Sequence, residues 1–449
     1  MRVKNHLLID IFKGIGLTNQ RLCLMAQTGK AWGNKMKRVI KITSIVCLAM
    51  ALAVFSAVAV MALQLPDNFL VETGQQLYVD NNIKAGIMQD KQSGKAVTAE
   101  KALSSGNSYK TQLKIFGIIP IKDVNVSIVE SKTVIPCGTP FGIKMFTDGV
   151  VVVGLTDVDD GTSLVNPAKN AGIKLGDILT AVNGHKISAN EDLAREVSAA
   201  GGAPMTITVR RGNNVFDATL TPVKAKGDGK YKAGIWVRDS SAGIGTVTFY
   251  DAATRLFGGL GHPVCDIDTG EMLPLMSGEV VDVTITSVNK GLPGLPGELR
   301  GSFNSSTAAG YLITNSETGL YGMLNESPST HTAMPVALKQ QVSEGKATIL
   351  STIEGSEPTE YDIVIEKVNM NDSNPTKNLI IRITDKRLLD ATGGIVQGMS
   401  GSPILQNGML AGAVTHVFVN DPTRGYGIFA ENMLLSADSI GKAVKAKAS

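Results

Sequence analysis

An uninterrupted apolar segment near the N-terminus constrains this chain more than any other feature of its sequence. The segment runs from Ile42 to Leu65, contains no charged residue and ends at Pro66-Asp67. A helix needs about 20 apolar residues to cross the hydrocarbon core of a bilayer, so the segment predicts a transmembrane anchor over residues 42–65. A cleaved signal peptide is the alternative, with Ala57-Val58-Ala59 as a small-residue cleavage site.

Charges around this segment predict its orientation. Basic residues cluster between positions 35 and 41, and the next acidic residue is Asp67. Positively charged flanks stay in the cytoplasm, so residues 1–41 are expected to be cytoplasmic and the rest exported. Met36 begins a conventional export signal, which leaves open whether translation starts at Met1 or at Met36.

The exported part has the sequence pattern of a mainly β protein. Glycine is abundant, at 48 residues, and short runs rich in Val, Ile and Thr alternate with turn residues. No basic stripe with interleaved aromatic residues occurs, which argues against nucleic-acid binding. The acidic runs at 157–161 and 266–271 lack the spacing of a calcium loop, and no Cys/His cluster has zinc spacing. No metal or other cofactor is therefore expected.

Two regions precede the C-terminal part of the chain. Residues 66–134 are mixed and become polar around Asn81 to Asn107, which predicts a stalk or linker. Residues 135–223 resemble a PDZ domain, most specifically in PAKNAGIKLGDIL from Pro167 to Leu179. Cys137 in this region and Cys265 further on are the two cysteines that are free to meet outside a membrane, although two separate small hydrophobic residues are the simpler expectation.

The PDZ resemblance predicts a peptide site. Such domains add a peptide strand to a sheet edge, beside a loop whose N–H groups hold a C-terminal carboxylate. We expect this loop at Thr139 to Ile143, with Phe141, Gly142 and Ile143 in contact with the peptide. The alternative is a PDZ fold that only packs against the catalytic domain.

A serine-centred motif lies within residues 235–437, the expected peptidase domain. Gly398-Met399-Ser400-Gly401-Ser402-Pro403 matches the Gly-x-Ser-Gly-x-Pro turn of chymotrypsin-like proteases, and Asn407-Gly408 then predicts a hairpin. The glycines let backbone N–H groups converge where an oxyanion forms, and by analogy Gly398 and Ser400 supply these donors. The motif predicts a chymotrypsin-like double β-barrel with Ser400 as nucleophile.

The nucleophile needs a base, and the chain has five histidines. His262 lies in a glycine-rich turn, GGLGHPV, and precedes Ser400 as the histidine does in chymotrypsin-like proteases. His416 follows the nucleophile on a predicted strand, where a structural role is expected. The residues alone leave the orienting acid open among Asp266, Asp268, Asp282, Asp362, Asp372, Asp385 and Asp390.

At these positions the chain resembles the stage IV sporulation protein B peptidase family. The resemblance covers residues 135–434 and is carried by the GHPV segment at His262 and by the residues of 384–389, 392–404, 412–422 and 425–427. It implies a serine endopeptidase with His262, Asp385 and Ser400 as the triad.

The same resemblance implies a biological setting. Members are exported from the forespore into the space between the two spore membranes. There they cleave a regulatory subunit of a membrane-embedded metalloprotease complex, which leads to activation of a late sporulation sigma factor. Self-cleavage in the N-terminal part and peptide recognition by the PDZ domain belong to this picture. The alternatives are an inactive membrane-anchored PDZ scaffold and a quality-control protease of broad specificity.

Overall fold

The computed structural model describes residues 19–90, 103–104, 106–303, 307–371 and 373–448. The chain forms two compact units, Met1–Gln64 and Leu65–Ser449.

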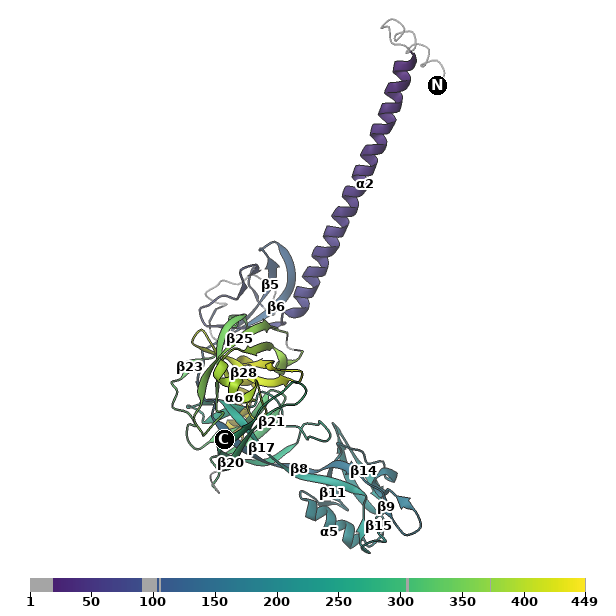
Figure 1. Ribbon diagram of the computed structural model, residues 1–449, viewed down its shortest axis with the longest axis vertical. Coiled ribbons are helices and arrows are strands. Elements are labelled where there is room, and N and C mark those ends of the chain that lie inside the picture. The colour runs from purple at the N-terminus through teal and green to yellow at the C-terminus, as the bar shows by residue number, and fades with distance from the viewer. Residues whose placement is uncertain (1–18, 91–102, 105, 304–306, 372, 449) are drawn as a thin grey trace. The chain divides into compact units, whose positions relative to one another are not determined.

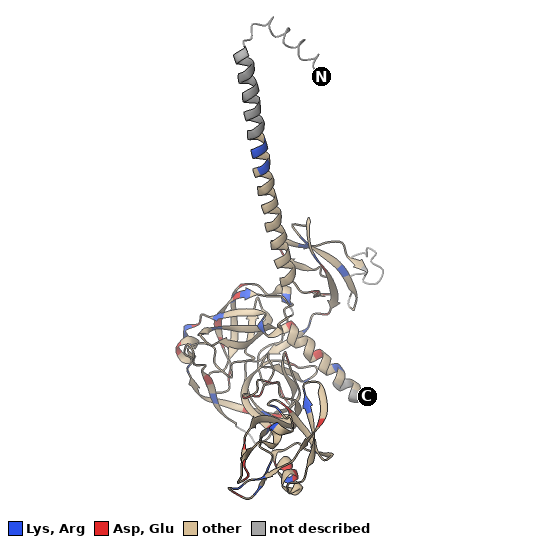
Figure 2. Cartoon of the chain, turned by 90° about the vertical axis from the view of Figure 1, so that its right-hand side faces the viewer, with Lys and Arg blue, Asp and Glu red and all other residues tan. Residues whose placement is uncertain are grey.

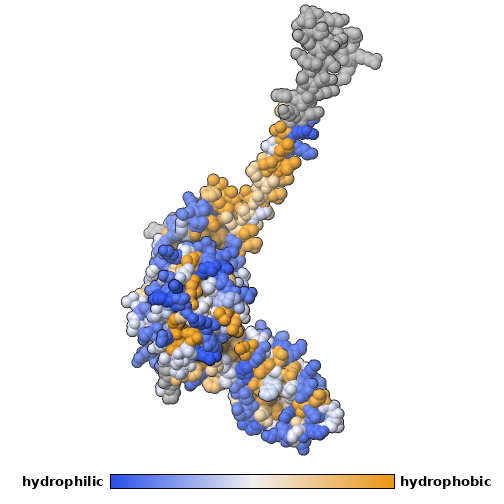
Figure 3. Space-filling model, in the orientation of Figure 1, coloured by the Kyte–Doolittle hydropathy of each residue, from blue (hydrophilic) through white to orange (hydrophobic). Residues whose placement is uncertain are grey.

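The first unit contains one long helix, α2 (Asn19–Gln64). Its stretch Met36–Gln64 is long and apolar enough to cross a membrane, a criterion that signal sequences also meet. Figure 3 shows the apolar surface of this stretch, and Figure 2 shows basic residues near its N-terminal end and no charged residue along the remainder. The predicted apolar helix is thus present, whereas residues 1–18 of the expected cytoplasmic segment lie outside the described residues.

The second unit begins with a small folded sheet where the sequence predicted a stalk. Its strands pair in the order β1-β6-β5-β3-β2, with β4 beside β5. Tyr109 and Leu113 alternate with polar residues along one strand and pack with Phe69 and Val126 in a common core. The stalk prediction is therefore wrong for the described part of residues 66–134, because this alternation was overlooked; residues 91–102 and 105 lie outside the description. The strands are β1 (Asn68–Glu72), β2 (Tyr78–Asp80), β3 (Ile83–Ala85), β4 (Gln89–Asp90), β5 (Ser108–Ile115) and β6 (Ile119–Val129).

Six further strands close into a first barrel. The long strand β8 pairs with β17 along one edge and with β19 along the other, and the ring runs β8-β17-β18-β22-β21-β19. Phe141, Met145, Phe257 and Leu260 are buried in the same core cluster. The strands of this barrel are β8 (Pro140–Leu155), β17 (Ile235–Asp251), β18 (Leu256–Gly259), β19 (Leu275–Asn289), β21 (Gly310–Ser316) and β22 (Gly319–Leu324), and β7 (Thr133–Pro136), β20 (Glu298–Phe303) and β23 (Met334–Pro335) flank it.

A second closed barrel follows with the same connectivity. Its order is β24-β25-β26-β29-β28-β27, so in both barrels the strands are arranged 1-2-3-6-5-4 in chain order. The predicted mainly β fold with a double barrel is confirmed. The elements are β24 (Gly345–Ser351), β25 (Thr359–Val368), β26 (Leu379–Ile383), β27 (Pro403–Gln406), β28 (Met409–Phe418) and β29 (Asp421–Phe429), with η1 (Lys339–Gln341), η2 (Pro375–Lys377), α6 (Lys386–Thr392) and α7 (Ala430–Ala448) between and after them.

The PDZ domain is inserted between the first two strands of the first barrel. The far end of β8 and the beginning of β17 extend out of the barrel and pair with each other inside the PDZ sheet (Figure 1). The structure therefore divides the chain differently from the predicted boundaries 135–223 and 235–437, because one strand can serve two domains. The inserted elements are β9 (Val158–Asp159), β10 (Leu164–Val165), α4 (Pro167–Asn170), β11 (Ile178–Val182), β12 (His185–Lys186), α5 (Asn190–Ala200), β13 (Met205–Arg211), β14 (Asn214–Leu220), β15 (Val223–Lys224) and β16 (Tyr231–Lys232).

Truncation of a core side chain tests the folded N-terminal sheet. Phe69 is 1% exposed, so Phe69→Ala is expected to lower the free energy of unfolding by about 3–5 kcal/mol, since it leaves a cavity. Tyr78 lies in the same sheet but is 60% exposed, so Tyr78→Ala serves as the control and should change stability little. Chemical unfolding of the detergent-solubilised chain measures both. Equal stability of Phe69→Ala and the unaltered chain would contradict this fold.

Candidate active site and peptide groove

The turn that carries Ser400 depends on glycine at two positions. Gly398 and Gly401 have φ values of +96° and +97°, in a region that side-chain-bearing residues rarely adopt. A Cβ on Gly401 would lie 2.0 Å from the carbonyl oxygen of Thr246. The turn between α6 and β27 can therefore lie directly against β17 only because this residue is glycine.

Strand β17 of the first barrel holds this turn of the second barrel. The Thr246 N–H donates to the Ser400 carbonyl (3.0 Å), and the Thr246 hydroxyl donates to the Gly398 carbonyl (2.8 Å). The Thr248 hydroxyl donates to the Gly401 carbonyl (2.8 Å). The nucleophile turn is thus fixed by hydrogen bonds that cross the boundary between the barrels.

The backbone of the turn leaves two donors available. The N–H groups of Met399, Gly401 and Ser402 donate to Val396, Val414 and Met399 carbonyls, respectively. Within the part of the chain that the structure describes, the N–H groups of Gly398 and Ser400 have no such acceptor. These are the two donors that the sequence predicted for an oxyanion hole.

His262 and Ser400 lie against adjacent residues of β28. The Ser400 hydroxyl donates to the Thr415 carbonyl (2.8 Å), and the His262 ring lies 4.8 Å from the ring of His416, centroid to centroid. A Cβ on Gly261 would lie 3.0 Å from the Thr415 methyl group. The structure therefore brings the predicted nucleophile and base to one region, with the serine hydroxyl bonded to the backbone.

The environment of His262 favours a neutral ring of one tautomer. Its Nδ1 lies 2.8 Å from the Pro263 carbonyl oxygen, so Nδ1 carries the hydrogen and Nε2 is the acceptor. Burial lowers the pKa of His262, and the bond to Pro263 opposes this shift. The pKa of His416 is lowered to about 4, first by desolvation and then by the nearby charges of His262 and Lys377.

The structure does not bring Asp385 to this histidine. The carboxylate of Asp385 caps α6 by accepting from the Arg387 N–H (2.9 Å), and it also accepts from the Arg387 guanidinium (2.7 Å) and the Asp362 N–H (3.3 Å). The bond to Arg387 is the main cause that lowers its pKa to about 2. Its position at the end of β26 makes it a helix cap, so the triad role that the family resemblance implied has no support in this geometry.

The predicted peptide loop is also placed elsewhere. Phe141 and Ile143 are buried in the first barrel, and Gly142 lies against Phe303 and Val281. Both edges of this part of β8 are occupied, by β17 and by β19, so no edge is left for an added peptide. The expected carboxylate loop at Phe141, Gly142 and Ile143 is therefore a barrel strand.

A groove in the PDZ domain instead lies between α5 and the start of β17. Residues 235–238 of β17 pair with β8 along one edge, and among the described strands no other strand pairs with this stretch. The groove has a volume of about 880 Å³ and contains Leu193, Val197, Tyr231, Ile235 and Val237 together with the basic residues Arg195, Lys230 and Lys232. Apolar walls with basic groups nearby suit an apolar peptide that ends in a carboxylate.

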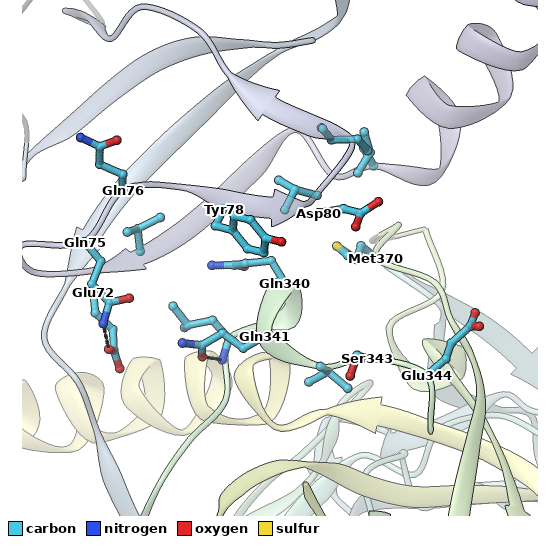
Figure 4. Close-up of a pocket in the computed structure, with 16 residues that line it drawn as sticks. Glu72, Gln75, Gln76, Tyr78, Asp80, Gln340, Gln341, Ser343, Glu344 and Met370 are labelled. Carbon is cyan, nitrogen blue, oxygen red and sulfur yellow. Dashed lines mark hydrogen bonds between the residues drawn. The ribbon is translucent and has the colours of Figure 1, made fainter. Parts of the chain in front are cut away.

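Another cavity, of about 840 Å³, lies between the N-terminal sheet and η1 (Figure 4). Gln340 and Gln341 of η1 lie opposite Tyr78 and Asp80 there, and the charged residues of its lining are all acidic. None of the residues of the serine turn or the histidine turn lines it. The cavity is separate from the candidate active site.

Sequence reasoning missed several residues of the site. In the sequence, Thr246 and Thr248 have the pattern of ordinary strand residues. His416 was expected to have only a structural role in its strand. Their roles depend on contacts between segments far apart in the chain, for which the sequence carries no local signal. Cys137 and Cys265 are not bonded to each other, as the simpler expectation had it.

Two family models match parts of this chain. The family model for the SpoIVB peptidase S55 matches residues 229–434, and that for a PDZ domain matches residues 166–211. The probable periplasmic serine endoprotease DegP-like of Brucella suis is 40% identical over 88 residues, which are 19% of this chain and 16% of that protein. A putative zinc metalloprotease of Clostridium perfringens is 33% identical over 70 residues, which are 16% of this chain and 21% of that protein. The chain thus spans only a small part of these relatives.

Solved structures show weaker similarity. The PDZ domain of an SdrC-like protein from Listeria monocytogenes has a TM-score of 0.17 at 21% identity and covers 20% of this chain and 87% of that one. The HtrA-type protease AlgW with a decapeptide has a TM-score of 0.27 at 13% identity and covers 45% and 54%. Such low scores add nothing to the strand pairings described above. The family models identify this chain as one that carries a SpoIVB-type S55 peptidase domain and a PDZ domain.

Proposed function

We propose that the chain is a serine endopeptidase in which Ser400 is the nucleophile and His262 the general base. The observation that carries this proposal is that Ser400 contacts Thr415 and His262 contacts the adjacent His416, beside two backbone N–H groups without an acceptor in the described chain. A glycine-serine turn in an inactive scaffold needs neither a neutral, oriented histidine nor free amide donors.

The proposed reaction is acyl transfer to Ser400. After rotation about χ1, Ser400 Oγ attacks the scissile carbonyl carbon, and its proton passes to Nε2 of His262. The N–H groups of Gly398 and Ser400 donate to the oxyanion of the tetrahedral intermediate. His262 then gives the proton to the departing amine nitrogen as the C–N bond breaks. A water molecule, deprotonated by the same Nε2, attacks the acyl-enzyme, and the acyl–oxygen bond breaks to release the acid and restore Ser400.

We propose further that the substrate is a protein presented at the membrane. The apolar stretch of α2 and the family match support an exported, membrane-tethered protease that acts in the forespore intermembrane space. There its target would be a regulatory subunit of a membrane metalloprotease complex, and cleavage would signal activation of a late sporulation sigma factor. Self-cleavage in the N-terminal part would release the catalytic domains from the anchor.

Labelling with a fluorophosphonate probe tests the nucleophile and the base. The unaltered chain is expected to react through Ser400, Ser400→Ala to lose all labelling, and His262→Ala to lose most of it, because the hydroxyl then lacks a proton acceptor. Ser402→Ala, which alters the neighbouring serine, is the control for non-specific reaction. Equal labelling of the unaltered chain and Ser400→Ala would favour an inactive scaffold.

The pH dependence of this labelling reports on His262. Burial lowers the pKa of the ring, so the neutral base persists below the ordinary histidine value of about 6.5. The midpoint of the fall in the rate constant should therefore lie below pH 6.5, where the ring becomes protonated. Measurement of the labelling rate across pH checks this, and a midpoint above 6.5 would contradict a desolvated base.

Peptide binding tests the groove between α5 and β17. We expect a decapeptide with three apolar C-terminal residues to bind, and its C-terminal amide to bind about tenfold more weakly, since the charged acceptor is lost. Trp236 is 65% exposed beside the groove, so Trp236→Ala should lower the affinity without unfolding the domain. Val215→Ala, at a 66% exposed position of β14, is the control. Calorimetric titration that gives equal affinities for acid and amide would refute a carboxylate site.

A further inference from the structure

The ring of His262 is oriented by a peptide group. Its Nδ1 bonds to the carbonyl oxygen of Pro263 (2.8 Å), and the acidic residues of the same loop are engaged elsewhere. Asp266 is wholly buried and accepts from Arg238 and from the N–H groups of Asp268 and Thr269 (both 3.0 Å). The position that an aspartate occupies in chymotrypsin-like proteases is thus filled here by a backbone carbonyl.

This carbonyl belongs to a peptide group that a side chain fixes. The Pro263 C=O and the Val264 N–H are two ends of one planar unit. The Val264 N–H donates to Oδ1 of Asn315 (2.9 Å), so the plane that carries the acceptor for His262 is set by Asn315.

Asn315 also ties together the two ends of the loop after the histidine. Its Nδ2 donates to the carbonyl oxygens of Val264 (2.8 Å) and Leu273 (2.9 Å). Asn315 lies in β21, next to the tight connection to β22 at which Gly319 packs against the backbone of Gly259 and Gly261. Strand β21 of the first barrel and its connection to β22 therefore pack against the turn that carries His262.

We propose that Asn315 is a positioning residue for the general base. It acts through the Pro263–Val264 peptide, which it holds in the plane that lets the carbonyl accept from Nδ1 of His262. The hydrogen bond to Oδ1 also polarises the peptide group, which strengthens the carbonyl as an acceptor. This inference rests on the proposed role of His262.

Two substitutions in the full chain separate positioning from structural support. Asn315→Ala removes all three hydrogen bonds, and the fluorophosphonate labelling rate of Ser400 is expected to fall at least about tenfold, with the pH midpoint displaced downward because the bond that raises the pKa of His262 is weakened. Asn315→Asp keeps an acceptor for the Val264 N–H and loses both donors. Asn315→Asp should therefore label faster than Asn315→Ala. A purely structural role predicts that the labelling rate of Asn315→Asp falls at least as far as that of Asn315→Ala.

The matched control is Asn166→Ala. Asn166 is a buried asparagine that caps α4 in the PDZ domain, where its Oδ1 accepts from the Lys169 N–H (2.9 Å). This variant should lose stability and keep the labelling rate and the pH midpoint. Labelling of Asn315→Asp no faster than Asn315→Ala, or labelling of both at the rate of the unaltered chain, would overturn the proposal. Failure of the unaltered chain to label at Ser400 would instead refute the proposed function.

Discussion

The hydrogen bonds between β17 and the serine turn are the contact on which the candidate site depends. Thr246 and Thr248 donate to carbonyl groups on both sides of Ser400, and Gly401 is the residue that allows so close an approach. Each barrel alone closes its own backbone hydrogen bonds, but neither contains both Ser400 and His262. Since the two residues lie on different barrels, the proposed chemistry requires a fixed boundary between the barrels, and these hydrogen bonds fix it.

The electrostatics of the site follow from that packing. Burial of His262 disfavours its charged form, which keeps the ring neutral and able to accept a proton. In the proposed reaction, the two free amide donors would stabilise the developing oxyanion. Asp385, by contrast, keeps its charge through Arg387 at the start of α6 and contributes to the helix end. The position of Asp385 shows that an acidic residue at a strand end is as well suited to capping as to catalysis.

Insertion of the PDZ domain within the first barrel places the candidate peptide groove and the candidate active site along one strand. The start of β17 lies beside the peptide groove, its middle forms the barrel wall, and Thr246 and Thr248 near its end contact the serine turn. Asp239 of the same strand accepts from the N–H of Asn190 at the start of α5, while Arg238 pairs with Asp266 and Asp268 in the loop after His262. Two adjacent residues of β17 therefore connect the helix beside the groove with the loop after His262. A flexible linker between separate domains would not provide such a connection.

The apolar helix, the β-rich fold, the PDZ motif and the glycine-serine turn could be predicted from the sequence, because each depends on local periodicity or on the conformational freedom of glycine. The sequence also selected His262, through its order relative to Ser400. It did not reveal the folded N-terminal sheet, the shared strands, the position of Asp385 or the groove between α5 and β17. Those features, and the contacts of Asn315, Thr246 and His416, arise only in the folded chain, since they depend on which strand edges and carbonyl groups meet when separate segments pack together. The Thr246 and Thr248 bonds to the serine turn, for example, join residues more than a hundred positions apart.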